Sequence, residues 1–233
     1  MIRKHIPNAI TCLNLLSGCI AIVFAFQGTY LTAAWLIALA AVFDFLDGFA
    51  ARLLKAYSPL GKELDSLADM VSFGVAPGMM IYGFISDSSF STNNSEYLAY
   101  FAFLIPVFSA LRLANFNLDE RQATSFIGLP TPANALFWAF GIAGSFDYIL
   151  DTTFDPFIIV TVTIFFSWLL VSNLPMFSLK FKHYKWRGNR LRYYFLAGCI
   201  ALMLFLGISG LSACILWYIG LSFLSFISEK RRA

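Results

Sequence analysis

The sequence has little charge: only 12% of its 233 residues are Asp, Glu, Lys or Arg, and only two are His. Soluble domains carry about 25% charged residues, so this composition excludes an ordinary soluble domain. Hydrophobic residues make up 59% of the chain and recur in long runs, as transmembrane helices require. The composition therefore predicts an all-α integral membrane protein with a single domain, residues 1–233. Membrane lipids are its expected surroundings, and no nucleic-acid partner is expected.

Cysteine is also scarce. The four cysteines all lie inside apolar stretches, and no pair has the spacing of a metal site. Neither a disulfide framework nor a cysteine-based metal site is therefore expected. We interpret the four thiols as small packing residues.

The start of the chain resembles a secretory signal peptide because a short basic segment precedes an apolar run. That run extends from Ile6 to about Gln27. It is longer than the roughly 7–15 residues of a signal peptide's hydrophobic segment. The length favours an uncleaved first transmembrane span.

Apolar runs separated by turn and breaker residues predict a bundle of about eight transmembrane helices. The last two runs are joined only by the short segment from Gly207 to Gly210, which predicts a tight helical hairpin. No internal repeat is evident along the chain. The predicted spans are residues 7–27, 30–54, 63–86, 97–118, 129–146, 154–178, 192–207 and 210–228.

The basic residues are distributed asymmetrically about these spans. With eight spans, all 16 Lys and Arg lie on one side, whereas the opposite loops contain only acids. Because basic loops stay in the cytoplasm, both termini are predicted to be cytoplasmic. The basic segment from Lys180 to Arg192 either fixes this topology or attracts anionic lipid head groups. The acids of the opposite loops are Asp87, Glu96, Asp147, Asp151 and Asp155.

Four aspartates interrupt the second and third spans near their predicted cytoplasmic ends. Asp44 and Asp47 are three positions apart, and Asp65 and Asp69 are four apart, so each pair shares one helix face. The short connection between the two spans predicts antiparallel neighbouring helices. The four carboxylates are therefore expected to converge at one end of the bundle.

Carboxylates in an apolar span are generally functional and need compensating charge. Arg52 and Lys62 could pair with one or two of them in a structural salt-bridge cluster, but this leaves other acids uncompensated. Hard divalent cations prefer several carboxylate oxygens, and two such ions about 4 Å apart suit phosphoryl transfer. A site for divalent cations is the favoured interpretation. A transporter pathway lined by acids is the alternative from another functional class.

The aspartates belong to a longer pattern, Asp44-x2-Asp47-Gly48-x2-Ala51-Arg52-x8-Gly61-x3-Asp65-x3-Asp69. It resembles the signature of the CDP-alcohol phosphatidyltransferase family at every fixed position and in both gaps. The resemblance implies this family's membrane-embedded fold and an enzyme that moves a phosphatidyl group from a CDP-lipid to a small alcohol, releasing CMP. It also implies that the four aspartates hold two divalent ions, Mg²⁺ or Mn²⁺ with Ca²⁺ as a further option. Asp69 would also be the general base for the acceptor hydroxyl.

The resemblance further implies contacts with the nucleotide. Asn8, Thr11 and Asn14 form a run similar to the family's amino-terminal element at the nucleotide site. From the residues alone, Asn8 could instead cap a helix, and Thr11 and Asn14 could form hydrogen bonds between helices. The complete set expected to contact the CDP-lipid is Asn8, Thr11, Asn14, Gly48, Ala51, Arg52, Gly61 and Lys62.

Three stretches outside the signature, residues 70–77, 109–117 and 126–133, resemble family members that use L-serine. The resemblance implies transfer from CDP-diacylglycerol to the serine hydroxyl, giving phosphatidylserine and CMP in phospholipid biosynthesis. Glycerol 3-phosphate and inositol are the alternative acceptors. The resemblance also implies a homodimer. The predicted topology, together with lipid synthesis that faces the cytoplasmic nucleotide pool, predicts the cell (inner) membrane with the active site facing the cytoplasm. Residues 7–150 would form the catalytic core, and residues 190–233 an extra C-terminal helical hairpin.

Arg112 lies at the predicted cytoplasmic end of the fourth span. It could be a topological anchor whose side chain snorkels to the interface. Alternatively, its guanidinium could grip the carboxylate of serine or the lipid phosphate with paired hydrogen bonds. The second interpretation makes Arg112 the candidate acceptor-binding residue.

Overall fold

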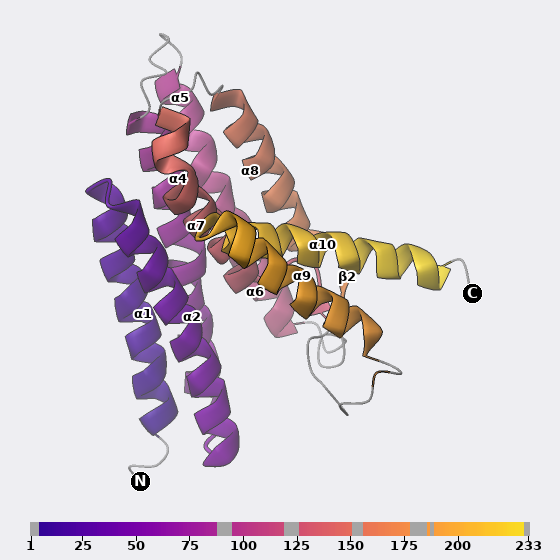
Figure 1. The fold of residues 1–233 in the computed structure, drawn as a ribbon. Helices are drawn as coiled ribbons and strands as arrows, with labels where there is room; N and C mark the ends of the chain where they lie inside the picture. The colour runs from indigo at the N-terminus through magenta and orange to yellow at the C-terminus, as the bar shows by residue number, and fades with distance from the viewer. Residues whose placement is uncertain are drawn as a thin grey trace.

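The computed structural model describes residues 5–87, 95–118, 126–150, 156–177, 186 and 189–230. In these residues the chain is a bundle of helices with one small two-stranded sheet (Figure 1). The elements are α1 (His5–Phe26), α2 (Tyr30–Leu53), α3 (Pro59–Asp69), η2 (Met70–Val75), α4 (Ala76–Asp87), α5 (Ser95–Ala99), η3 (Tyr100–Phe103), α6 (Leu104–Leu118), β1 (Phe126–Ile127), α7 (Thr131–Leu150), α8 (Pro156–Val171), β2 (Pro175–Met176), α9 (Arg190–Leu206) and α10 (Ser209–Lys230).

Helices α1 and α2 pack side by side through small residues. The buried residues of the pair include Ala21 and Ala25 of α1 and Ala33 and Ala34 of α2. Large apolar side chains such as Leu16 point outward and are exposed. Small residues inside and large apolar residues outside are typical of helix pairs in a membrane, where lipid covers the outer surface.

Five helical stretches are long and apolar enough to cross a membrane, and α8 is a shorter apolar helix. The remaining predicted spans correspond to α7 and α9. The prediction of an all-α integral membrane protein is therefore confirmed. The five long stretches are His5–Phe26, Tyr30–Leu53, Pro59–Ser86, Tyr97–Leu118 and Ser209–Ser228.

The third span is one continuous run of α3, η2 and α4. Ser58 caps its start: the Gly61 N–H donates to Ser58 Oγ at 3.0 Å, and Pro59 occupies a position in the first turn where its missing N–H is not needed. Directly after Asp69 the helix widens into the π-helix η2 before α4 begins. Short π-helical segments are rare and often lie at functional sites.

The predicted span 154–178 is wrong at its C-terminal end because α8 stops at Val171. The chain then forms β2, whose residues pair in antiparallel register with β1, Phe126 opposite Met176 and Ile127 opposite Pro175. Pro175 disfavours further helix because it restricts the residue before it to extended backbone. The strand pair joins the segment before α7 to the segment after α8.

Gly128 allows β1 to turn into α7. Its φ is +79°, and a Cβ at this position would lie 2.7 Å from the Leu170 carbonyl oxygen and 2.9 Å from that of Ser172. Its N–H donates to the Leu174 carbonyl at 2.8 Å. The position therefore needs both the backbone freedom and the small size of glycine.

Gly128→Ala is expected to destabilise the protein by at least about 1–2 kcal/mol, the cost of left-handed backbone for a residue with a Cβ. The matched control is Gly220→Ala in α10, where a Cβ would meet nothing within 4 Å. That substitution is expected to stabilise its helix by about 0.5–1 kcal/mol. Thermal unfolding of the purified variants in detergent measures both effects, and equal melting temperatures would contradict this account of Gly128.

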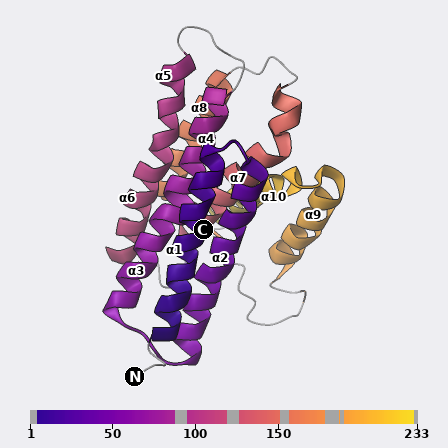
Figure 2. The ribbon, with the colours of Figure 1, turned by 90° about the vertical axis from the view of Figure 1, so that its left-hand side faces the viewer.

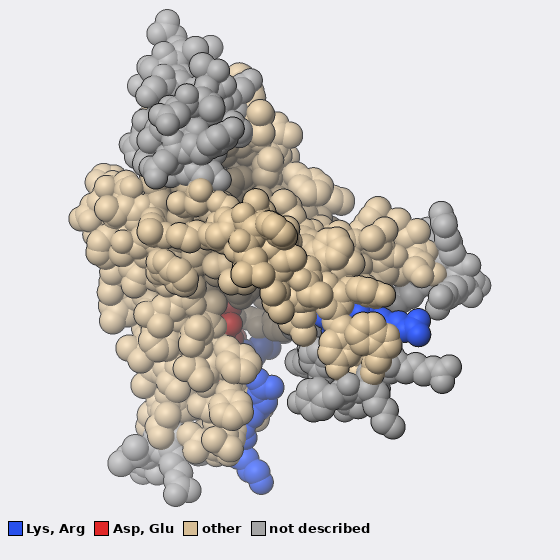
Figure 3. Space-filling model, viewed as in Figure 1, with Lys and Arg blue, Asp and Glu red and all other residues tan. Residues whose placement is uncertain are grey.

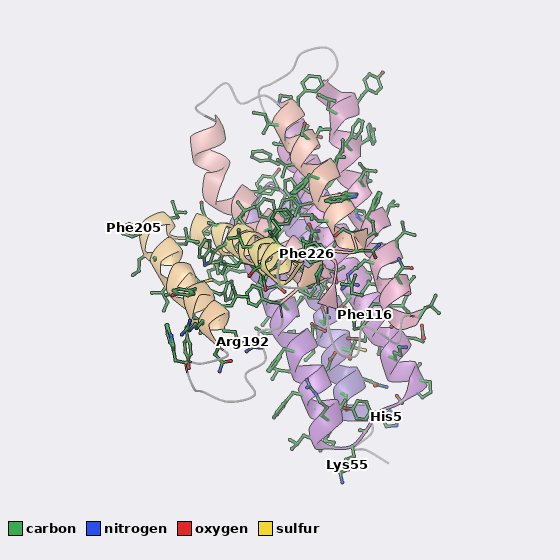
Figure 4. All side chains as sticks on the ribbon, turned by 90° about the vertical axis from the view of Figure 1, so that its right-hand side faces the viewer. His5, Lys55, Phe116, Arg192, Phe205 and Phe226 are labelled. Carbon is green, nitrogen blue, oxygen red and sulfur yellow. The ribbon has the colours of Figure 1, made fainter. Side chains whose placement is uncertain are left out.

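The predicted C-terminal hairpin is present as α9 and α10, joined through Gly207 at φ +57°. It does not extend the bundle in parallel: α10 runs across the other helices in Figure 1, packed on α7 and α9. None of the residues of α9 is buried. Trp186 stacks on Tyr193, with ring centroids 5.1 Å apart, beside Arg192 at the lower end of α9 (Figure 4).

The predicted cytoplasmic orientation depends partly on charges outside the described residues. These include Arg121, most of the segment from Lys180 to Arg192, and the opposite-side acids Asp151 and Asp155. Within the described part, His5 and Lys55 lie at the same end of the α1–α2 pair (Figure 4). The orientation of the termini stays a prediction.

Candidate active site

Helix α1 lies between α2 and α3 and packs against both (Figure 2). The sequence predicted that α2 and α3 would be direct antiparallel neighbours. The two helices instead make few direct contacts, and α1 fills the space between them. The aspartates of α2 and α3 therefore meet beside α1, which packs against both helices.

The structure brings the carboxylates together at this point. Asp44, Asp47 and Asp65 each offer an oxygen, and these oxygens all lie within 4.8 Å of one another. We call these three residues the acid cluster. Asp69 lies one turn further along α3, is only 8% exposed, and is not part of this group. The expected four-membered set of metal ligands thus appears as a cluster of three and a neighbouring fourth carboxylate.

Arg52 and Lys62, the two candidates for pairing with the aspartates, each donate a hydrogen bond to a backbone oxygen. Arg52 Nε donates to the Gly48 carbonyl at 2.9 Å, and Lys62 Nζ donates to the Asn117 carbonyl at 3.1 Å. Each cation is thus directed to a backbone oxygen of its own surroundings. The geometry gives no support to the salt-bridge interpretation of the aspartates.

The acid cluster fits a divalent cation. Close carboxylates repel one another unless positive charge separates them. Asp65 Oδ1 is buried and has no hydrogen-bond partner among the described residues. An oxygen of this kind is costly to leave unpaired, and several carboxylate oxygens at short range are the donor set that hard divalent cations prefer. Asp44, Asp47 and Asp65 could therefore hold such an ion.

A cavity of about 550 Å³ adjoins the acid cluster. Its volume is within the usual range of small-molecule sites. It contains six of the residues expected to contact the CDP-lipid, whereas Asn14 and Arg52 do not line it. The lining residues are Pro7, Asn8, Thr11, Asp47, Gly48, Ala51, Ala56, Tyr57, Ser58, Pro59, Gly61, Lys62 and Asp65.

Two glycines of the motif shape this cavity in different ways. A Cβ on Gly61 would lie 3.0 Å from Asn8 Oδ1 and 3.1 Å from Ser58 Oγ, so glycine lets α3 approach α1 closely. A Cβ on Gly48 would meet only Arg52, at 3.8 Å, so its face of α2 borders open space. Figure 3 shows an acidic side chain at the bottom of a hollow between the α1–α2 pair and the α9–α10 hairpin, with Lys and Arg side chains along its lower edges.

The polar residues of α1 bind the aspartates themselves. Thr11 Oγ1 lies 2.6 Å from Asp47 Oδ2, and Asn14 Nδ2 donates to Asp69 Oδ1 at 3.1 Å. Ser72 Oγ of η2 donates in turn to the backbone carbonyl of Asn14 at 2.9 Å. The sequence analysis expected Thr11 and Asn14 either to contact the nucleotide or to form hydrogen bonds between helices. The structure shows hydrogen bonds between helices, whose partners Asp47, Asp69 and Ser72 the sequence did not single out.

Arg112 is 5% exposed, so it is not a side chain that reaches the interface as a topological anchor. Its Nε donates to the Leu129 carbonyl at 3.3 Å, and its guanidinium carbon lies 5.6 Å from the centre of the Phe116 ring. The hydrogen bond to Leu129 ties α6 to the segment that leads into α7. Arg112 does not line the 550 Å³ cavity.

Further buried polar groups lie on α6 and α7. Ser109 is one turn before Arg112, and Asn134 is in the first turn of α7; both are fully buried. Ser109 Oγ and both amide atoms of Asn134 have no hydrogen-bond partner among the described residues. Sequence reasoning missed them, although a polar residue in an apolar span is itself a functional signal.

Comparison with known proteins identifies the chain's relatives. A model of the CDP-alcohol phosphatidyltransferase family matches residues 4–144. A CDP-diacylglycerol–serine O-phosphatidyltransferase of Bacillus subtilis is 34% identical over 183 residues, which are 78% of this chain and 92% of that protein. A protein of the same name from Helicobacter pylori is 32% identical over 186 residues, 77% of this chain and 74% of its own.

A third protein of that name, from the archaeon Methanocaldococcus jannaschii, is 40% identical over 137 residues, which are 58% of this chain and 60% of that protein. The matched region of the family model contains the acid cluster, Asp69 and the cavity. By this match and by its membrane-embedded helical fold, the chain belongs to the CDP-alcohol phosphatidyltransferase family.

Proposed function

We propose that the protein transfers the phosphatidyl group of CDP-diacylglycerol to the hydroxyl of L-serine, giving phosphatidylserine and CMP. The observation that carries this proposal is the acid cluster at the side of a cavity large enough for a nucleotide. The serine acceptor is supported by the names of the similar proteins from three organisms. No comparable match supports glycerol 3-phosphate or inositol among these relatives.

The cavity is the proposed site of the cytidine diphosphate part of the lipid. Asn8, Thr11, Gly48, Ala51, Gly61 and Lys62 line it and would surround the nucleotide. Gly48 and Ala51 leave one wall of α2 almost without side chains, so that a ligand can approach the backbone. Arg52 lies beside Gly48 and would add positive charge near the pyrophosphate.

Asp44, Asp47 and Asp65 are the proposed ligands of a divalent cation, and Asp69 would complete the set for a second one. When bound, such ions offset the negative charge of the pyrophosphate and of the departing CMP. The chain itself contributes by holding three carboxylates within 4.8 Å of one another on two helices that α1 keeps in place.

Asp69 is the proposed general base. The serine oxygen forms a bond to the phosphorus of the phosphatidyl group, and the bond between that phosphorus and the CMP oxygen breaks. The hydroxyl proton passes to Asp69, and the electron pair of the broken bond leaves with CMP. A positioned carboxylate base of this kind contributes about 100- to 10,000-fold to rate.

Arg112 is the proposed site for the serine carboxylate. A guanidinium has five N–H donors in a fixed planar arrangement, which matches a carboxylate. Burial of Arg112 strengthens such a pair because water does not screen it. Glycerol 3-phosphate and inositol have no amino-acid carboxylate, so this contact would favour serine.

Arg112→Lys is expected to raise the apparent KM for serine by about tenfold, because a lysine cannot make paired hydrogen bonds and one charged hydrogen bond is lost. The KM for CDP-diacylglycerol should change little. Arg52→Lys is the matched control. It should raise the KM for CDP-diacylglycerol and leave the KM for serine almost unchanged. Steady-state kinetics with each substrate varied in turn decide the matter, and a change only in the CDP-diacylglycerol KM of Arg112→Lys would overturn the assignment.

The experiment that tests the reaction class is release of CMP by the purified protein from CDP-diacylglycerol. Release should require serine and a divalent cation, and a chelator should abolish it. CMP release that does not depend on the metal would contradict the proposed use of the acid cluster. A transporter would release no CMP under any of these conditions.

We place the catalytic core at residues 7–150, the active site on the cytoplasmic side of the cell (inner) membrane, and residues 190–233 in an additional hairpin. The family match, which ends at residue 144, supports the first boundary. The predicted basic side of the membrane supports the second, because basic loops stay in the cytoplasm. We further propose a homodimer, and the mass of the detergent-solubilised protein tests it.

A further inference from the structure

Asn14 lies beneath the cavity and does not border it. Its side chain is completely buried, and among the residues of α1 only Pro7, Asn8 and Thr11 line the cavity. A nucleotide in the cavity therefore meets the first two turns of α1 and not the turn that contains Asn14. The cavity itself therefore gives Asn14 no place at which to contact a nucleotide.

The neighbour that Asn14 does reach is Asp69. Asn14 Nδ2 donates to Asp69 Oδ1 at 3.1 Å, while Asn14 Oδ1 has no hydrogen-bond partner among the described residues. The opposite orientation of the amide would place its oxygen against a carboxylate oxygen. The donor side of the amide is therefore the side that holds Asp69.

Asn14 is itself held in place by the π-helix that follows Asp69. Ser72 Oγ donates to the backbone carbonyl of Asn14 at 2.9 Å. The two segments are close because residue 18 is glycine: a Cβ at Gly18 would lie 2.7 Å from Ser72 Cα. Contacts at Asn14 and at Gly18 thus fix α1 against η2, the segment that directly follows Asp69.

Thr11 repeats this arrangement one turn earlier on α1. Its hydroxyl has one hydrogen and lies 2.6 Å from Asp47 Oδ2 and 3.1 Å from the Pro7 carbonyl, so the shorter contact with the carboxylate takes the hydrogen. Thr11 and Asn14 are three residues apart and share a face. One hydroxyl holds an acid of α2, and one amide holds an acid of α3.

We infer that α1 is a positioning helix for the carboxylates, in which Asn14 orients Asp69 and Thr11 orients Asp47. This inference rests on the proposed function, in which Asp69 accepts the proton. It explains why α1 lies between α2 and α3, which make few direct contacts of their own. Loss of the Asn14 donor should impair the chemical step and leave nucleotide binding intact.

Asn14→Leu keeps the branching of the side chain at Cγ, adds some volume and removes the donor. The expected result is a fall in kcat of about 10- to 100-fold, the usual effect of removing a residue that orients a ligand or base. The KM for CDP-diacylglycerol should stay within about twofold of the wild-type value. The Kd for CDP, measured by isothermal titration calorimetry, should also stay within about twofold. Asn14→Asp, which sets a second carboxylate against Asp69, should lower kcat further.

Asn8→Ala is the matched comparison, an asparagine of the same helix that does line the cavity. It should weaken CDP binding and raise the KM for CDP-diacylglycerol. Cys12→Ala, at an exposed position of α1 outside the site, controls for general effects on the helix and should resemble the wild type. Ser72→Ala removes the contact that holds Asn14 and should lower kcat by a smaller factor in the same direction.

The inference is overturned if Asn14→Leu weakens CDP binding at unchanged kcat, or if kcat and CDP binding both match the wild type. If Asn14→Leu does not fold, the Ser72→Ala variant decides: an increased KM for CDP-diacylglycerol with normal kcat contradicts the proposal. CMP release is measured with whichever acceptor the wild type uses. The serine assignment can therefore fail while the role of Asn14 stands. Equally, the role of Asn14 can fail while serine is the acceptor.

Discussion

Replacement of Asp69 by Asn is expected to lower kcat for CMP release by about 100- to 10,000-fold, the contribution of a general base. The amide has the same shape as the carboxylate, and its carbonyl oxygen can still accept the hydrogen bond from Asn14 Nδ2. The variant should therefore fold normally and lose the ability to take the serine proton. Single-turnover CMP release at saturating CDP-diacylglycerol and serine measures the chemical step directly.

Glu63→Gln is the matched control for this substitution. Glu63 is exposed on the same helix, is an acid, and lies outside both the acid cluster and the cavity. The exchange removes the same charge and should leave kcat unchanged. If Asp69→Asn and Glu63→Gln both retain wild-type kcat, Asp69 is not the base.

The second large effect is expected for Asp65→Asn. This change removes one of three carboxylates that lie within 4.8 Å of one another. Loss of a direct metal ligand should cost at least as much as loss of a residue that orients one, so CMP release at a fixed metal concentration should fall by at least about 100-fold. Raising the metal concentration should restore part of the activity.

Thermal unfolding provides an independent test of the acid cluster. A ligand that binds only the folded protein raises its melting temperature, so Mg²⁺ or Mn²⁺ should stabilise the wild type more than Asp65→Asn. Without metal, Asp65→Asn should have a higher melting temperature than the wild type. The substitution relieves repulsion among the carboxylates and removes the unpaired charge at Asp65 Oδ1. A metal-induced shift that is equal in the two proteins would exclude Asp65 as a ligand.

The sequence predicted those features of the site that depend on spacing along a single helix. Asp44 with Asp47 and Asp65 with Asp69 had to share a face, because residues three or four apart are neighbours in any α-helix. The apolar runs likewise located the spans to within a few residues, except at the C-terminal end of α8, since each must be long enough to cross the hydrocarbon region. Both features follow from local geometry.

The arrangement of one helix against another was less predictable. Local spacing shows that Asn14 shares a face with Thr11, but it does not show whether that face meets a ligand or Asp69. The short connection between α2 and α3 suggested direct neighbours, whereas α1 lies between them. Helix packing in a membrane depends on small residues such as Gly18, whose partner Ser72 is far away in the chain.

The burial of Arg112 and the end of α8 show the same limit. A basic residue at the end of a span resembles an interface anchor in sequence, and only the fold shows it 5% exposed and bound to Leu129. The apolar residues after Val171 looked like more helix, but strand pairing with residues 126–127 competes for them. In both cases the deciding contact joins segments that are distant in the sequence.

The most direct test of the whole account is an acceptor panel. The purified protein is supplied with CDP-diacylglycerol, a divalent cation and, in separate reactions, L-serine, glycerol 3-phosphate or inositol, and the lipid product is identified by mass spectrometry. We predict phosphatidylserine with serine, no phosphatidyl product with the other two acceptors, and no product from Asp69→Asn. Phosphatidylinositol or phosphatidylglycerophosphate in the absence of phosphatidylserine would contradict the account.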